Sequence, residues 1–283
     1  MAIWNKNEQE YLANNKTLFE SFMLADKDGN IINSFGIASN IPIANGDVDG
    51  YAAIHKFGRN PNVGNAPETV WMHGGKYQYL AVDSPSTVYA YSADSEDSAS
   101  GDGARTVSIL GLDNDFNEIE ETITVNGAVS TKTFLRIYRA FVATAGSTNT
   151  NEGNVLISTG AGGTGTVLAD IGTIGTGTTF GLGQTQLALY TIPAGKTGYL
   201  TTWNVGCAPM NNKATVLLKS RELDGDAPFR TKDIVDLVGG YHTQNYSIPL
   251  RFPEKTDIEV VAAGDTGTII SSSFDIILVD NPA

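Results

Sequence analysis

Three glycines in the stretch NVLISTGAGGTGTVLAD (residues 154–170), Gly160, Gly162 and Gly165, have the G-x-G-x-x-G spacing of a dinucleotide-binding loop. That loop works only where the glycines open a helix whose N-terminus holds a pyrophosphate, with an acidic residue about 20 positions further on. Here β-branched residues and further glycines follow, which disfavours a helix, and no acid comes after Asp170 before Glu222. We therefore interpret the glycines as a loop and predict that no cofactor binds there.

A second pattern, Asp113, Asp115 and Asn117, alternates like the first ligands of a calcium loop. The sixth position of such a loop requires glycine and the twelfth a bidentate glutamate, but this chain has Glu118 and Thr124 there. We interpret the stretch as the polar tip of a hairpin and predict no metal site.

Residues suited to nucleophilic catalysis are few. The chain has one cysteine, Cys207, and three histidines, His55, His73 and His242, none in a recognisable nucleophile motif. We expect Cys207 to be a small buried hydrophobe, which fits a protein assembled in a reducing compartment. No paired carboxylates stand out as acid and base, so we predict that the protein is not an enzyme.

The charge is strongly acidic, with 18 Lys plus Arg against 31 Asp plus Glu and a net charge of -13, which argues against nucleic acid as a partner. Ten of the acids lie in residues 83–121, where Arg105 is the only base. This segment could bind divalent cations or a basic partner, but we favour a solvated face. No apolar run reaches the roughly 18 residues that span a bilayer, and the start MAIWNKNEQEYLANN does not resemble a secretory signal, so no membrane partner is expected.

The elements that would position any site are strands. From residue 86 onward, short stretches rich in Val, Ile, Thr, Tyr and Phe alternate with clusters of Gly, Pro, Asn and Asp, which predicts an all-β protein. Residues 86–159 predict a small antiparallel β-sandwich, and residues 184–283 a second, jelly-roll-like sandwich. Residues 160–183, with nine glycines and six threonines, predict a linker between them.

Residues 1–85 lack a period that would bury a core of their own, apart from a helix or arm up to about Asn15 and a hairpin turning at Asp28-Gly29. We expect an extended arm that docks on another surface. Aromatic side chains are the usual anchors of such interfaces, and the candidates are Trp4, Phe19, Phe22, Phe57 and Trp71. For Trp71, in WMHGGKY, a buried anchor beside a glycine turn is the favoured alternative.

Self-association is expected of the C-terminal sandwich, with a homotrimer as the preferred state. The candidate contact strands are TQNYSIPLRF and FRTKDIVDLV. By their period of two, one face carries Tyr246, Ile248, Leu250 and Phe252. Pro249 and Pro253 suit an edge strand, where no ladder donor is needed. The alternative is that this face fills the core of one subunit.

Several stretches carry a resemblance to a known group of proteins: MLADKDGNIIN, IHKFGRNP, ARTVSILGLDNDFNEIEETITVNG, TFLRIYRAFVATAG, LYTIPAGKTGYL and IPLRFPEKTDIEV. Together they resemble the virion structural proteins of tailed bacteriophages, particularly those of marine and freshwater bacteria. The resemblance implies a virion component, assembled in the host bacterial cytoplasm, whose partners are the major capsid protein or other virion proteins. It carries over no catalytic residue.

From the residues and the resemblance together we expect a non-enzymatic virion structural protein, a capsid decoration or cement protein or a minor head protein. The alternative is a tail, neck or fibre component whose C-terminal sandwich contacts the host surface. A carbohydrate-active enzyme, the third class, would need an acid pair that the sequence does not display.

Overall fold

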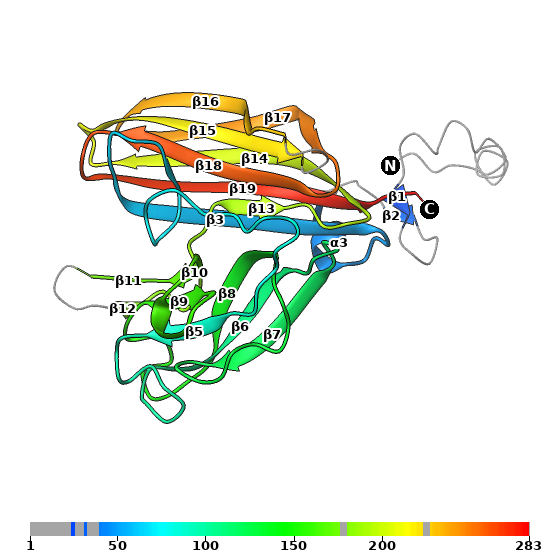
Figure 1. Cartoon of the computed structure of the whole chain (residues 1–283). Helices are drawn as coiled ribbons and strands as arrows, with labels where there is room; N and C mark the ends of the chain where they lie inside the picture. The colour runs from blue at the N-terminus through cyan, green and yellow to red at the C-terminus, as the bar shows by residue number, and fades with distance from the viewer. Residues whose placement is uncertain (1–23, 26–30, 33–39, 176–179, 223–226, 283) are drawn as a thin grey trace, which may run out of the picture.

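The computed structural model describes residues 24–25, 31–32, 40–175, 180–222 and 227–282 (Figure 1). Within them the chain folds into antiparallel β-sheets, with a short helix α3 (Asn40–Asn45) and a 3-10 turn η1 (Ala161–Gly163), which confirms the predicted all-β class. Strands β1 (Leu24–Ala25) and β2 (Ile31–Ile32) pair as the hairpin expected around Asp28-Gly29. The remaining strands form a larger and a smaller β-sandwich.

The larger sandwich is a jelly roll of eight strands. Its strands are β3 (Tyr51–Val63), β13 (Leu189–Thr191), β14 (Lys196–Ala208), β15 (Lys213–Glu222), β16 (Arg230–Val238), β17 (Gly240–Phe252), β18 (Thr256–Gly264) and β19 (Thr268–Asp280). They pair from the outside inward, β3 with β19, β13 with β18, β14 with β17 and β15 with β16, as when one long hairpin is rolled up. The two sheets have the orders β17-β14-β19-β3 and β13-β18-β15-β16, with β4 (Glu68–Thr69) added to β18. This confirms the jelly-roll prediction.

The expected arm, residues 1–85, is wrong for residues 51–63, which form the first jelly-roll strand, and for residues 68–69, which pair with β18. β3 runs antiparallel to β19 from the Tyr51–Val279 pair to the Val63–Thr268 pair. Its buried positions toward the core include Lys56, Gly58 and Asn60, so the strand lacks the alternating apolar residues by which a strand is recognised.

The smaller sandwich is inserted between β3 and β13. One of its sheets has the order β7-β6-β8 and the other β10-β9-β5. The strands are β5 (Tyr89–Ser92), β6 (Ala104–Leu112), β7 (Glu118–Thr124), β8 (Arg136–Ala145), β9 (Val155–Ser158) and β10 (Val167–Ile171). Val107, Ile109 and Ile123 are buried in its core, on the face that the alternation in β6 and β7 predicts.

The linker prediction for residues 160–183 is also wrong, because this segment contains β10, a strand of the smaller sandwich. β10 pairs with β9 and buries Leu168, Ala169 and Ile171 in the core. The glycines before it close the β9–β10 hairpin, in which the Gly160 N–H donates to the Thr164 carbonyl (3.0 Å). Further on, β11 (Thr173–Ile174) pairs with β12 (Phe180–Gly181). The loop interpretation of the glycine motif is therefore confirmed: a strand follows it, not a helix.

A buried ionic network joins the two sandwiches. Arg136 of β8 donates from Nε and Nη2 to the two carboxylate oxygens of Asp257 in β18, at 3.0 and 3.2 Å. Arg221 of β15 and the Thr191 hydroxyl also donate to Asp257. The guanidinium of Arg136 and that of Arg221 both lie over the ring of Tyr79, 5.1 and 4.6 Å from its centroid.

Candidate interaction surface

The jelly roll has two open sides, one between the edge strands β3 and β13 and the other between β16 and β17. The smaller sandwich lies against the first (Figure 1): Leu187 donates its N–H to the Phe57 carbonyl, and Lys56 donates to the Tyr138 carbonyl. Within the described part of the chain, β16 pairs only with β15 and β17 only with β14. Of the two sides, the β16–β17 side is therefore the one that no described strand or sandwich covers.

Large apolar side chains are exposed on these two strands. The four are Ile234 (57 %), Val238 (63 %), Tyr241 (68 %) and Ile248 (83 %). Exposed strand edges are templates for pairing with another chain, and clustered exposed apolar residues mark interaction sites. We therefore define β16 and β17 with these side chains as the open edge, the candidate interaction surface.

The two strands of the open edge are held against each other by side chains on their inner faces. Val235, Leu237 and Leu250 pack against the jelly-roll core, and the Tyr246 hydroxyl donates to Asp233 Oδ2 at 2.6 Å. Burial, together with the Asp233 carboxylate, raises the pKa of Tyr246 well above its usual value.

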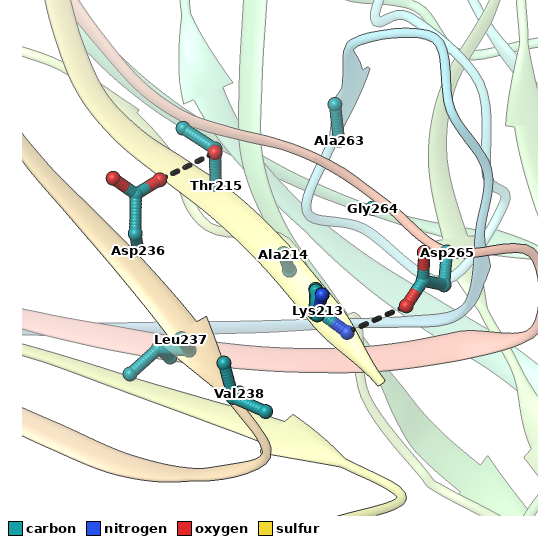
Figure 2. A pocket seen from close by; sticks show the side chains of 9 residues that line it. All are labelled: Lys213, Ala214, Thr215, Asp236, Leu237, Val238, Ala263, Gly264 and Asp265. Atoms are coloured by element: carbon teal, nitrogen blue, oxygen red, sulfur yellow. Dashed lines mark hydrogen bonds between the residues drawn. The ribbon is translucent and has the colours of Figure 1, made fainter. Parts of the chain in front are cut away.

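A surface hollow of about 320 Å³ adjoins β16 on the outer face of its sheet (Figure 2). It lies over the ends of β15, β16 and β18, with Asp236 and Asp265 on its two sides. Thr215 donates to Asp236 at 2.5 Å and the Lys213 N–H to Asp265 at 2.9 Å. The hollow thus carries two carboxylates beside the exposed side chain of Val238.

Of the two residues predicted as contacts on β17, Phe252 is 2 % exposed and lies in the core, so the alternative of a core position is correct for it. Tyr246 is half-buried. An irregularity in the β14–β17 ladder, between the Leu200–Leu250 and Thr202–Asn245 pairs, breaks the predicted period of two. Ile248 is in consequence exposed on the surface.

The predicted aromatic anchors of residues 1–85 separate into three groups. Trp4, Phe19 and Phe22 lie outside the described residues. Trp71 is 3 % exposed, and its Nε1–H donates to the Gly75 carbonyl at 3.0 Å, so the favoured alternative of a buried anchor is correct. Phe57, on β3, is half-buried and stacks on His55 with ring centroids 5.8 Å apart.

A cavity of about 430 Å³ lies between β3 and the smaller sandwich, lined by Lys56, Tyr138 and Tyr190 among others. Burial, and next the charge of Arg139, lowers the pKa of Lys56 to about 7. A lysine with this pKa is a nucleophile near neutral pH, but its amine already donates to the Tyr138 carbonyl. We assign it the role of a tie between β3 and β8.

The acidic segment, residues 83–121, contains one fully buried carboxylate. Asp97 accepts four hydrogen bonds, from the Ser92 hydroxyl and from the backbone N–H groups of Ala104, Glu152 and Gly153. Within the described residues, no group of three or more His, Cys, Asp or Glu is placed to hold a metal ion.

Two other predictions concern single residues. Asp113 accepts from the N–H groups of Asp115 and Asn117, which confirms the polar hairpin tip. Cys207 is buried, as expected, and burial raises the pKa of its thiol.

Sequence reasoning missed the charged residues of β16, Arg230, Lys232 and Asp236, all of which are exposed. The signal is present in FRTKDIVDLV, which has bases at its start and an acid near its end. Lys56 was missed because a lysine at a core-facing strand position has no distinctive sequence signal.

No protein-family model and no curated protein matches the chain. Among solved structures it is similar to a chain in the structure of infectious bursal disease virus Gx strain, at 8% identity over 82% of this chain and 76% of that one, with a TM-score of 0.22. A chain in the structure of the Gt strain is similar at 8% identity over 82% and 80%, with a TM-score of 0.11. TM-scores this low carry no argument about fold or function. The helices of the described residues are all too short or too polar to cross a membrane.

Proposed function

We propose that this protein is a non-enzymatic virion structural protein, a capsid decoration or cement protein or a minor head protein that stabilises the particle. The observation that carries the proposal is the open edge, two edge strands whose outer sides have no partner strand within the described residues and which carry four exposed apolar side chains. Such a surface fits a component present in repeated copies. The jelly roll recurs in viral capsid proteins, but a fold alone does not determine function, so it counts only as support.

The proposed partners are further copies of the chain and the major capsid protein or other virion proteins. Residues 1–39, with Trp4, Phe19 and Phe22, are the proposed attachment to the particle. The alternative function is a tail, neck or fibre component, which is favoured by the use of jelly rolls as lectin domains. In that role the sandwich would contact the host surface.

Quantitative mass spectrometry of purified virions tests the proposal. A decoration protein should be present in hundreds of copies, whereas a dozen or fewer would favour the tail or neck. A chain missing from purified particles but abundant in infected cells would contradict a virion role. Deletion of residues 1–39 should abolish incorporation into the particle while the jelly roll stays folded. The full-length variant Trp4→Ala removes one proposed anchor without shortening the chain, so it separates the loss of an anchor from the effect of the truncation.

A further inference from the structure

We propose that β16 pairs with β16 of a second copy of this chain across a two-fold axis at Ile234, so that two jelly rolls share one continuous sheet. The inference deepens the proposed function, because it rests on the protein acting in repeated copies. It specifies which of the two exposed strands makes the contact and in which register.

The free side of β16 presents backbone groups for such pairing. Gly239, directly after β16, donates its N–H to the Asn212 carbonyl next to β15, at 2.8 Å. Because backbone groups alternate in direction along a strand, the N–H and C=O groups of Ile234, Asp236 and Val238 point away from β15. They are available to an incoming strand.

In the absence of a second strand, the N–H of Ile234 finds a hydrogen-bond acceptor within its own chain. It donates to Oδ1 of the preceding Asp233, at 2.8 Å, while Oδ2 of the same carboxylate accepts from Tyr246. A carbonyl of a second β16 can replace Oδ1 without disturbing the bond to Tyr246. The exchange leaves no buried donor unpaired.

Charge complementarity fixes the register. With antiparallel strands and the axis at Ile234, each Lys232 faces Asp236 of the other copy, and the exposed Ile234 side chains face each other. Arg230 lies beyond the irregularity at Lys232, where the ladder pairs it with Ser220, and the regular register does not include it. Moving the axis to Asp236 would place two carboxylates directly opposite, which is unfavourable.

The hollow of Figure 2 extends the same complementarity. It opens beside Val238 and contains the carboxylates of Asp236 and Asp265. The pairing carries Lys232 of the second copy toward Asp236, at the side of this hollow. The basic start of one strand therefore meets the acidic end of the other, twice per dimer.

The competing interpretation is that β16 is protected against pairing. Its ladder with β15 has an irregularity at Leu218/Lys219, which leaves Lys232 as an extra residue, and charged bulged edges discourage association. In β16, however, the charges have opposite signs at the two ends and an apolar side chain lies between them. The bulge shortens the backbone ladder, so the ion pairs carry much of the contact and salt should weaken it.

Sedimentation of the full-length chain over roughly 1 to 200 µM tests the proposal. We expect a dimer for the wild type, with Lys232→Glu and Asp236→Lys each weakening dimerisation at least about tenfold, because each creates two like-charge contacts. An equimolar mixture of the two variants should recover the dimer, since the new glutamate of the first variant then faces the new lysine of the second. Arg251→Glu, the same kind of charge change on β17, is the matched control and should still dimerise.

Three results would overturn the pairing: a wild type that stays monomeric at the highest concentration, a trimer, or a mixture that fails to recover the dimer although both variants melt like the wild type. A monomer would leave β16 as a protected edge, and a trimer would support the arrangement expected from the sequence. These measurements in solution are independent of the virion experiment, so the failure of one proposal is distinguishable from the failure of the other.

Discussion

Asp257→Asn should destabilise the protein more than other single changes to its charged residues, because Asp257 is the centre of the network between the two sandwiches. The side chain of Asp257 is 0% exposed and that of Arg136 is 1% exposed. Substitution by asparagine preserves the shape but leaves the Arg136 guanidinium buried without an anion. The NH₂ group of the new asparagine would also face donors that, in the wild type, bond to a carboxylate oxygen.

The expected loss is about 3–5 kcal/mol, the usual cost of removing one partner from a buried ion pair. Arg221 is 24% exposed on its side chain and can turn toward water, so the loss comes mainly from Arg136. At roughly 2 °C or more per kcal/mol for a chain of this size, the melting temperature should fall by at least about 6 °C.

Urea unfolding and calorimetry would measure this loss, with Asp115→Asn at the exposed β6–β7 hairpin tip as the matched control. Adding Arg136→Met to Asp257→Asn should recover part of the stability, because the orphaned charge is removed. If Asp257→Asn unfolds within about 1 kcal/mol of the wild type, the buried ion pair does not stabilise the junction, and the reasoning from its burial is refuted.

Three further outcomes are expected. Burial, with Arg139, lowers the pKa of Lys56 from 10.5 to about 7. Between these pH values the unfolded chain binds a proton that the folded chain does not, so the free energy of unfolding rises with pH. Lys56→Met should remove that rise in urea titrations from about pH 7 to about pH 9.5. Gly58→Ala should cost about 1–3 kcal/mol, because its Cβ would lie 2.3 Å from the Ala188 backbone. Gly206→Ala should be nearly neutral in the same unfolding assay, because the nearest atoms to its Cβ would lie 3.9 Å away, at ordinary contact distance. Deletion of residues 1–39 should leave the melting temperature of the isolated protein within about 2 °C of the wild type, measured by calorimetry.

Regular alternation made much of the fold predictable from the sequence. Most strands of the two sandwiches and the β6–β7 hairpin tip at Asp113 follow from local residue patterns. β3 was not recognised because Lys56 and Gly58 occupy core-facing positions, and β10 because glycine-rich sequence surrounds its short apolar run. Both strands form through pairing with the rest of the sandwiches, which local propensity does not encode.

The candidate surface could be predicted only in part. FRTKDIVDLV and TQNYSIPLRF are both edge strands, as their composition indicates, yet Phe252 points into the core and Ile248 to the surface. A bulge decides this difference, and nothing in the alternation of residues 241–252 reveals where the ladder with β14 is interrupted. The position of Trp71 depends likewise on a turn at Gly74 and Gly75, both at positive φ.

The insertion of the smaller sandwich between β3 and β13 has a consequence for assembly. A jelly roll with both open sides bare could pair edge to edge at each end and grow without limit. Here Phe57 and Lys56 of β3 are already bonded to the inserted sandwich, and the Arg136–Asp257 network holds that sandwich in place. Among the described residues only the β16–β17 side is left, and a two-fold contact through a single edge closes after two copies. The same insertion that hides one edge therefore makes an exposed apolar β16 compatible with a finite assembly.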